Sequence, residues 1–364
     1  MIAPDSALPL SPLAGLLPQA PASIPFCDVL TPQSFDAPGR EWSALTTATA
    51  VHDLGWLRRV AVRGEDRLRW LSGMVTNTVE GLAPHSGAWN LVLTAQGRIQ
   101  GDLTVWRGEN DALELEIAAN QAEKLLAHLD KFIIMDDVEL EPLNDLTALG
   151  LTGPQAAQAL AQLGFPALSA PLSRQTGSWN GHSVLVERLH GVLVEHYALW
   201  VAPALLLELW TALQEAGAAA VGVQTLEALR MAEAIPTYAI DMVERDLPQE
   251  TSQMRALHFD KGCYQGQEIV ERIRSRGNVH RHLRQLLLEG PLPAAGSELT
   301  YVKAAGETAP AGAVTSALEL PNGRRLALAM IRAEAEIRPQ PFLYFVDGAA
   351  GQAKVVPAPT AELL

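Results

Sequence analysis

Apolar and polar residues alternate along several stretches of the first half of the chain, and this spacing predicts short strands. Residues 60–64 read VAVRG, which indicates a strand ending in a glycine turn, and a helical pattern follows from Glu65. Two β-rich runs between residues 91 and 106 flank a turn at residues 95–97 and predict a hairpin. The clean alternation of residues 113–118, LELEIA, predicts a half-buried strand.

A helix is expected after that strand, because Asn120 and Glu123 have the spacing of a capping box. From about residue 146 the pattern becomes strand, helix, two strands, helix and strand, and it ends near residue 223. This β-α-β-β-α-β order is typical of a ferredoxin-like subdomain, which we predict for residues 146–223.

The rest of the chain changes character twice. Residues 224–235 have helical periodicity, and a polar, irregular stretch runs from about residue 240 to 260. The next helix begins just after Cys263, and Gly277 supplies its stop signal. From residue 279 to 364, short strands alternate with Pro and Gly, which is typical of a small β-barrel. The whole pattern predicts an α+β fold with a C-terminal β-barrel domain.

Composition narrows the class of protein. A chain of 364 residues is expected to form two or three domains. The net charge of −14 makes strong nucleic-acid binding unexpected, and no apolar run reaches the ~18–20 residues of a membrane span. Six prolines in the first 25 residues predict an irregular or extended N-terminal arm, residues 1–44, rather than a signal peptide. Two cysteines suit a reducing compartment, so we expect a cytoplasmic location.

The segment KGCYQGQE, residues 261–268, is the first chemical candidate. A neighbouring cation and a helix N-terminus both favour the reactive thiolate form of a cysteine. Lys261 lies two residues before Cys263, so we expect it to tune that thiol. The alternative is a buried cysteine in a turn that the glycines merely shape.

Asp102 is the second candidate, in the segment GRIQGDLTV. A carboxylate in an apolar strand is costly unless it is hydrogen-bonded or paired, so it could line a cavity and hold an amine or a pterin-type N–H pair. Alternation places Asp102, Thr104 and Trp106 on one side of the strand, and that side could equally face solvent.

Positive charge and aromatic rings supply the remaining candidates. Arg272, Arg274 and Arg276 concentrate positive charge in an acidic chain and suit a carboxylate or phosphate partner. A solvated helix face is the alternative for any single arginine. Trp56 follows a glycine and precedes two nearby arginines, so it is the best tryptophan to stack on a flat ligand, although core packing is the usual role.

At KGCYQGQE the sequence resembles the YgfZ-type folate-binding proteins, which are GcvT-like relatives of the aminomethyltransferase (T-protein) of the glycine cleavage system. The family pattern is Lys-Gly-Cys-[Tyr/Phe]-x-Gly-Gln-Glu. The resemblance extends through DLGWLRRVAVRGEDRLRWLSGMVTN, AQGRIQGDL, ALRMAEAIPTYAID and the basic RSRG segment. It covers nearly everything after about residue 45. The residues that match the pattern are Lys261, Gly262, Cys263, Tyr264, Gly266, Gln267 and Glu268.

The resemblance implies a three-lobed GcvT-like ring with tetrahydrofolate as cofactor. Its folate-binding domain would be discontinuous, made of residues 45–145 plus 224–278. The implied role is assistance in iron–sulfur cluster assembly or repair, with an effect on tRNA modification and with iron–sulfur client proteins as partners. The chemistry would rest on Cys263, Lys261 and Asp102, with no metal site. The folate contacts would be Asp102, Trp56, Tyr264, Gln267, Arg272, Arg274 and Arg276.

Two departures from T-proteins bear on the activity. T-proteins carry Arg-x-Glu-Ala-Gly before a proline, and that alignment puts Ala232 at the Glu position and Glu233 one residue later. One residue turns a helical side chain by about 100°, so Glu233 is not expected to inherit the role. T-proteins also have two adjacent aspartates where this chain reads Gly101-Asp102. A tetrahydrofolate-dependent aminomethyltransferase is therefore the alternative function, and a nonenzymatic scaffold is the second alternative.

Overall fold

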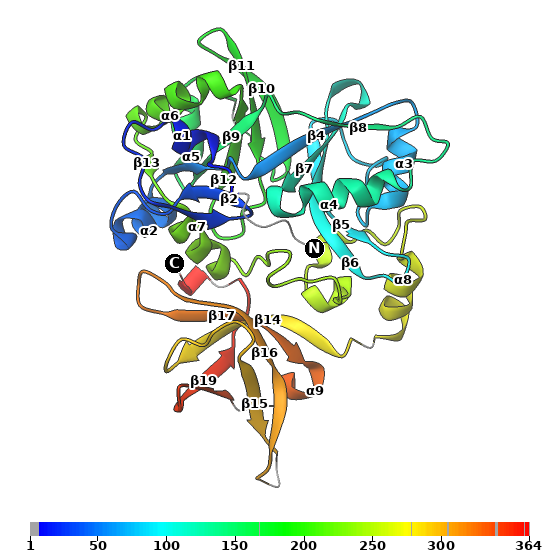
Figure 1. Cartoon of the computed structure of the whole chain (residues 1–364), viewed down its shortest axis with the longest axis vertical. Helices are drawn as coiled ribbons and strands as arrows, with labels where there is room; N and C mark the ends of the chain where they lie inside the picture. The colour runs from blue at the N-terminus through cyan, green and yellow to red at the C-terminus, as the bar shows by residue number, and fades with distance from the viewer. Residues whose placement is uncertain are drawn as a thin grey trace. The chain divides into compact units, whose positions relative to one another are not determined.

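The computed structural model describes residues 7–166, 168–277, 279–303, 306–338, 341–359 and 361–363. Within these ranges the strands form a two-stranded sheet, an 11-stranded sheet and a closed barrel at the C-terminal end of the chain (Figure 1). The predicted α+β class and the predicted C-terminal barrel are confirmed. No helix in the described ranges is both long enough and apolar enough to cross a membrane.

Contacts between residues divide the chain into two compact units. Unit 1 comprises the chain up to Ser72, Thr78–Trp89 and Leu103–Leu226, and unit 2 comprises Gly73–Asn77, Asn90–Asp102 and the chain from Glu227 onward. The four domains expected from the sequence have other limits and stay a prediction.

The α-helices and strands of unit 1 begin with several that the sequence did not predict. They are α1 (Pro12–Leu16), β1 (Ser23–Phe26), β2 (Val29–Pro32), α2 (Pro38–Thr47), β3 (Ala50–Asp53), β4 (Leu57–Arg63), β7 (Leu113–Ala118), α4 (Ala119–Asp130), β8 (Glu139–Pro142), β9 (Thr147–Thr152), α5 (Ala156–Gln162), β10 (Ser173–Trp179), β11 (His182–Arg188), β12 (His196–Val201), α6 (Leu206–Glu215) and β13 (Ala219–Ala220).

Four elements contain a boundary between the units: α3 (Arg67–Met74), β5 (Ser86–Leu93), β6 (Ile99–Arg107) and α7 (Val223–Ala232). The elements of unit 2 are two short 3-10 helices, η3 (Pro248–Thr251) and η4 (Met254–Ala256), then α8 (Gln267–Arg276), β14 (Arg281–Glu289), β15 (Glu298–Val302), β16 (Thr308–Glu319), β17 (Arg325–Arg332), α9 (Ala333–Glu336), β18 (Phe342–Val346) and β19 (Ala349–Val355). The barrel has the strand order β14-β17-β16-β15-β18-β19.

Three local predictions need correction. The segment predicted as ferredoxin-like contains an additional strand, β10, whose sequence SRQTGSW is too polar to show apolar periodicity. The N-terminal arm is not irregular throughout, because α1, β1 and β2 form within it and Leu10 bridges to Leu30. The helix α4 begins after Ala118, whose side chain makes no capping hydrogen bond, so Asn120 is not its N-cap.

Two apolar cores support these elements. In unit 1, the helices α5 and α6 pack on one face of the large sheet, where Leu160, Leu209 and Leu199 are each almost fully buried. In unit 2, alternate residues of the barrel strands fill its interior, including Leu286, Tyr344 and Ile331. Burial of such side chains contributes about 1.5–3 kcal/mol each relative to exposure.

A cluster of five charged side chains is buried on the sheet of unit 1. Arg59 of β4 has no exposed side-chain surface and contacts the carboxylate of Glu187 on β11. It also lies 3.4 Å from Glu116 Oε2 and 3.6 Å from Glu114 Oε2, both on β7. Arg174 of β10 donates to Glu114 at 2.8 Å. Two cations therefore face three carboxylates, and one proton would make the cluster neutral.

Glu116 is the carboxyl that takes this proton. Burial raises its pKa from 4.5 to about 8, and Arg59 opposes that shift. Glu187 contacts Arg59 closely and also accepts from Trp200 Nε1 at 2.9 Å, while Glu114 has its own partner in Arg174. Glu116 lies farther from Arg59 than Glu187 does, and among the described residues it has no second cation as Glu114 does, so its charge is the least compensated of the three.

This arrangement predicts a pH-dependent loss of stability. Since the folded-state pKa of Glu116 lies above its unfolded value, the folded protein holds an extra proton between pH 4.5 and about 8. The free energy of unfolding should therefore fall as pH rises through this window, on the order of 1 kcal/mol per pH unit from this group. Urea unfolding at pH 5, 7 and 9 should show this slope in the wild type and a flatter one in Glu116→Gln. The exposed-pair variant Glu141→Gln should retain the wild-type slope, and parallel curves for all three proteins would contradict the assignment.

Candidate functional site

The predicted cysteine loop lies in unit 2 and is tied to the end of α3. Lys261 Nζ donates to the backbone oxygens of Val75 and Asn77, at 2.7 Å each, and it lies 5.2 Å from the ring centroid of Tyr264. Cys263 is exposed and forms no disulfide. The ammonium group of Lys261 thus anchors the loop, and its predicted effect on the thiol stays a prediction.

Gly266 and Gln267 form the turn into α8. Gly266 has φ +81°, and a Cβ atom on it would lie 2.6 Å from the backbone oxygen of Thr94, so only glycine fits without displacing the chain. Gln267 begins α8, and its side chain accepts from the backbone N–H of Tyr264 at 3.3 Å. Gly266 therefore shapes the loop, while the Cys263 thiol remains open to solvent.

Thr76 and Asn77 hold the segment that precedes the loop. The buried Thr76 hydroxyl donates to Ala256 O at 2.7 Å and accepts from Leu91 N at 2.9 Å. Asn77 Nδ2 donates to Arg255 O at 2.8 Å. These hydrogen bonds hold the backbone at Arg255 within unit 2 and do not involve its guanidinium.

Asp102 is half-buried on β6 and belongs to a group of polar side chains in unit 2. Arg255 interacts electrostatically with both Glu233 and Asp102, but burial dominates and lowers the pKa of its guanidinium from 12.5 to about 10. Burial, with the Asp102 charge adding to it, raises the pKa of the Tyr238 hydroxyl. At neutral pH the site therefore contains a cationic Arg255 and a neutral Tyr238, which can donate a hydrogen bond.

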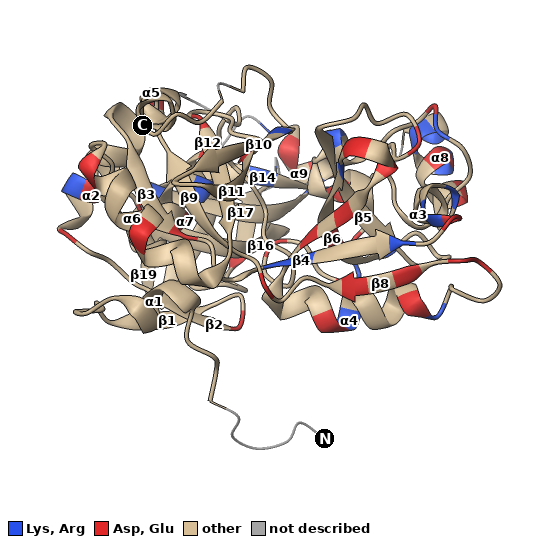
Figure 2. Ribbon diagram, turned by 90° about the horizontal axis from the view of Figure 1, so that it is seen from above, with Lys and Arg blue, Asp and Glu red and all other residues tan. Residues whose placement is uncertain are grey.

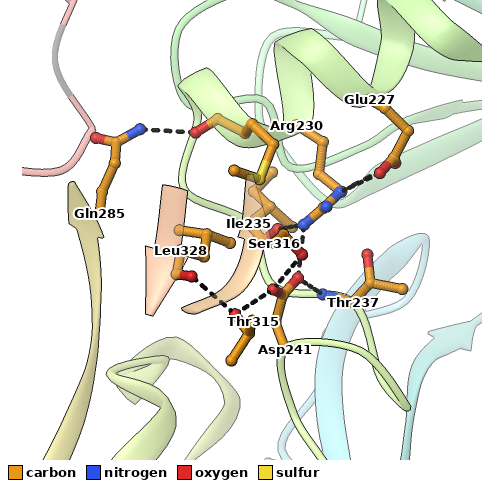
Figure 3. A network of polar contacts seen from close by, with 10 residues as sticks. Glu227, Arg230, Ile235, Thr237, Asp241, Gln285, Thr315, Ser316 and Leu328 are labelled. Atoms are coloured by element: carbon orange, nitrogen blue, oxygen red, sulfur yellow. Dashed lines mark hydrogen bonds and ion pairs between the residues drawn. The ribbon is translucent and has the colours of Figure 1, made fainter. Parts of the chain in front are cut away.

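A second buried network, shown in Figure 3, holds the turn that carries Glu233 and Tyr238. Asp241 is almost fully buried and accepts from the backbone N–H of Thr237 at 3.0 Å and from Arg230 Nη1 at 2.8 Å. Its other oxygen accepts from the hydroxyls of Thr315 and Ser316, at 2.6 Å each. One carboxylate thus joins α7, the turn and the barrel strand β16.

The remaining predicted residues are placed in two regions. Arg272, Arg274 and Arg276 are exposed on α8, where Figure 2 shows basic and acidic residues together. The Arg274 guanidinium stacks 4.5 Å from the Phe259 ring and pairs with Glu271 at 3.5 Å. Trp56 belongs to unit 1, where it packs edge-on against Phe26 with ring centroids 5.1 Å apart. Their roles toward folate stay predictions.

Sequence reasoning missed three members of this polar group: Glu233, Tyr238 and Arg255. Glu233 follows the last residue of α7, and its backbone N–H still donates to Leu229 O at 2.9 Å, as in a helix. Its offset from the T-protein Glu position therefore stays a prediction, yet its side chain is 3% exposed and acts on Arg255. The signal available in the sequence was Ala234 at the glycine position of the Arg-x-Glu-Ala-Gly pattern, which marks a turn.

The fold is that of a known class of protein. The glycine cleavage system aminomethyltransferase T of Bartonella henselae shares the fold, with a TM-score of 0.87 over 97% of this chain and 98% of that chain at 18% identity. Residues 20–261 match the family model described as the GCVT N-terminal domain. The match spans more than half of the chain, so the protein belongs to this family.

Relatives by sequence agree with that membership. An aminomethyltransferase of Rubrobacter xylanophilus is 30% identical over 81% of this chain and 79% of its own length. An aminomethyltransferase of Thermus thermophilus is 29% identical over 93% of this chain and 95% of its own length. A chloroplastic protein of Arabidopsis thaliana, described as a transferase, is 27% identical over 71% of this chain, which spans 61% of that relative's length.

The Asp241 network predicts a large effect from a small change. Asp241→Asn removes the buried charge that faces Arg230 and should lower the free energy of unfolding by about 3 kcal/mol. Glu227→Gln is the matched control, because Glu227 pairs with the same arginine but its side chain is 27% exposed; it should cost under about 1 kcal/mol. Urea unfolding measures both, and equal losses would show that Asp241 does not hold this turn.

The turn at Gly266 makes a second prediction. Gly266→Ala should lower the free energy of unfolding by about 2 kcal/mol, because the added Cβ meets backbone and the positive φ becomes strained. In Gly262→Ala the new Cβ would meet no atom within 4 Å, so stability should stay within about 1 kcal/mol of the wild type. Chemical denaturation measures the free energy of unfolding of both variants. A Gly266→Ala variant as stable as the wild type would contradict the close approach of Gly266 to the Thr94 backbone oxygen.

Proposed function

We propose that this protein is a tetrahydrofolate-dependent aminomethyltransferase or a close variant that transfers one-carbon units. The observation that carries the proposal is the polar group of unit 2, in which Asp102, Glu233, Arg255 and Tyr238 interact electrostatically. Relatives that carry the name aminomethyltransferase and cover most of this chain support the same activity. We therefore favour the aminomethyltransferase function over assistance in iron–sulfur cluster assembly or repair, which the sequence resemblance implied.

The donor set of this group fits a reduced folate. A pterin ring presents N–H groups, which can donate hydrogen bonds to carboxylates such as those of Asp102 and Glu233. It also presents a carbonyl oxygen, which can accept a hydrogen bond from Arg255 or Tyr238. The glutamate part of folate carries carboxylates, for which the exposed arginines of α8 are suitable partners. Tetrahydrofolate, when bound, would supply the nitrogen atoms that carry the one-carbon unit.

The chain's own residues would orient and polarise the reactants. Asp102 would accept a hydrogen bond from an amine N–H and stabilise positive charge on that nitrogen. Arg255 remains protonated at neutral pH, since its pKa is about 10, and would supply positive charge that acts on Asp102. Tyr238, whose pKa is raised, would stay neutral and donate through its hydroxyl.

The second candidate function is the folate-dependent support of iron–sulfur enzymes, with an effect on tRNA modification. The exposed thiol of Cys263 favours it, because an aminomethyl transfer centred on Asp102 gives this cysteine no task. In that function Cys263 would be the reactive group, and client proteins would be the partners.

One experiment tests both candidates. The purified wild type should bind tetrahydrofolate, seen as quenching of tryptophan fluorescence, and should form methylene-tetrahydrofolate from an aminomethylated lipoyl carrier. Asp102→Asn should lower the transfer rate at least about a hundredfold, while Cys263→Ser and the exposed-residue control Asp260→Asn should not. No transfer by the wild type would reject the first function. In a strain that lacks its own relative of this protein, loss of iron–sulfur enzyme activity that the wild type restores and Cys263→Ser does not restore would support the second function.

A further inference from the structure

Unit 1 contains a pocket that plays no part in the proposed transfer. Its volume is about 420 Å³, within the range of about 300–1,000 Å³ typical of small-molecule sites. Its walls come from β4, α4, the chain before β9 and the N-terminal segment, and they are largely apolar. The apolar lining includes Leu10, Val29, Leu57, Leu126, Leu143 and Leu146.

Arg58 brings a positive charge to this pocket. Arg58 and Arg59 are neighbours on β4, so their side chains leave opposite faces of the strand. Both arginines contribute atoms to the pocket lining, but the Arg59 guanidinium is taken up by the buried ion cluster, while the partly exposed Arg58 forms no ion pair among the described residues. Its Nη1 donates to the backbone oxygens of Gly55 at 2.8 Å and Leu57 at 2.9 Å.

Arg58 forms no ion pair with a carboxylate among the residues that the structure describes, and burial is the cause that lowers the pKa of its guanidinium. Glu123 lines the same pocket but is exposed to solvent and does not appear among the groups that act on Arg58. A half-buried guanidinium without an anion is costly, and a bound anion would remove that cost.

Thr147 adds an independent polar group to the pocket. It is 5% exposed at the start of β9, and its hydroxyl makes no hydrogen bond within the described part of the chain. Buried hydroxyls normally have a partner, so this one has an unused donor and acceptor. Thr147 and Arg58 both line the pocket and could serve the same polar ligand group.

The N-terminal segment completes the pocket. Ser11 N donates to Leu30 O at 2.9 Å, and Leu30 N donates to Pro9 O at 2.8 Å, which fixes Leu10 and Pro12 as part of the wall. The Leu10 side chain is 49% exposed. An apolar ligand chain would cover this surface.

We propose that this pocket binds a small anion with an apolar chain, its carboxylate or phosphate group held by Arg58 and Thr147. Arg58 supplies the charge-assisted hydrogen bonds, Thr147 supplies the hydroxyl, and the leucine-lined walls receive the chain. The site lies within unit 1 and is independent of the tetrahydrofolate function proposed for unit 2.

Calorimetric titration of the full-length protein with octanoate, octyl phosphate and the neutral octanamide tests this site. The wild type should bind at least one of the two anions, and octanamide should bind at least about tenfold more weakly. Comparison of the two anions identifies the preferred group. Absence of binding of both anions at millimolar concentration, or equal binding of octanamide, would overturn the proposal.

Variants of two arginines on β4 distinguish a loss of anion binding from a loss of folding. Arg58→Gln should weaken binding of the anion about tenfold to a hundredfold, and Arg58→Lys should restore part of it. Arg63→Gln, also on β4 but paired with Glu141 on the surface, should bind like the wild type. Thr147→Val should weaken binding without lowering the melting temperature, since the hydroxyl has no partner to lose. Wild-type affinity in Arg58→Gln, in a variant that melts normally, would reject the site.

Discussion

Arg59 has no exposed side-chain surface, so its guanidinium must find counter-charges inside unit 1. The three carboxylates that it faces come from β7 and β11, and Arg174 joins them from β10. Strands that are distant in sequence are thereby held in one arrangement, because moving any of them would leave a charge buried without a partner. Apolar packing alone tolerates small shifts, whereas this cluster does not.

The same constraint acts in unit 2 on a smaller scale. Asp241 joins α7 to β16 through four hydrogen bonds, and Lys261 joins the cysteine loop to the end of α3 through two backbone oxygens. Neither residue belongs to the polar group around Asp102, yet both fix segments that carry its members. A site that must hold a flexible cofactor depends on such support, since small displacements of a catalytic group strongly lower the rate.

Periodicity in the sequence was enough to predict much of this fold. Alternation predicted strands at residues 60–64 and 113–118 and a hairpin between residues 91 and 106, where the structure has β4, β7 and the pair β5 and β6. The described barrel strands follow from their Pro and Gly punctuation. Periodicity did not predict strand β10, because its side chains are mostly polar and its place in the sheet is set by its neighbours β11 and β5. Pairing with neighbouring strands decides whether such a segment forms a strand, and the pattern of a single sequence does not show that pairing.

The candidate site shows the same limit in a sharper form. Cys263 and Lys261 were visible because they share a dense local pattern, whereas Arg255 and Tyr238 stand in a stretch without periodicity and meet Asp102 through the fold alone. Glu233 was set aside for one role by its offset of one residue, which does not exclude its electrostatic interaction with Arg255. A pattern argument is therefore reliable within an element and does not predict side chains that meet only through the fold.

Arg58 and Arg59 are identical in type and adjacent in sequence, and only their partners distinguish them. Arg59 has several carboxylates around it, so the stability of unit 1 accounts for its presence. Arg58 is partly buried and donates to two backbone oxygens that water could serve as well, so the fold gains little from its charge. A charge and a buried hydroxyl that line one pocket, and that the fold does not use, are best explained by a ligand that uses both.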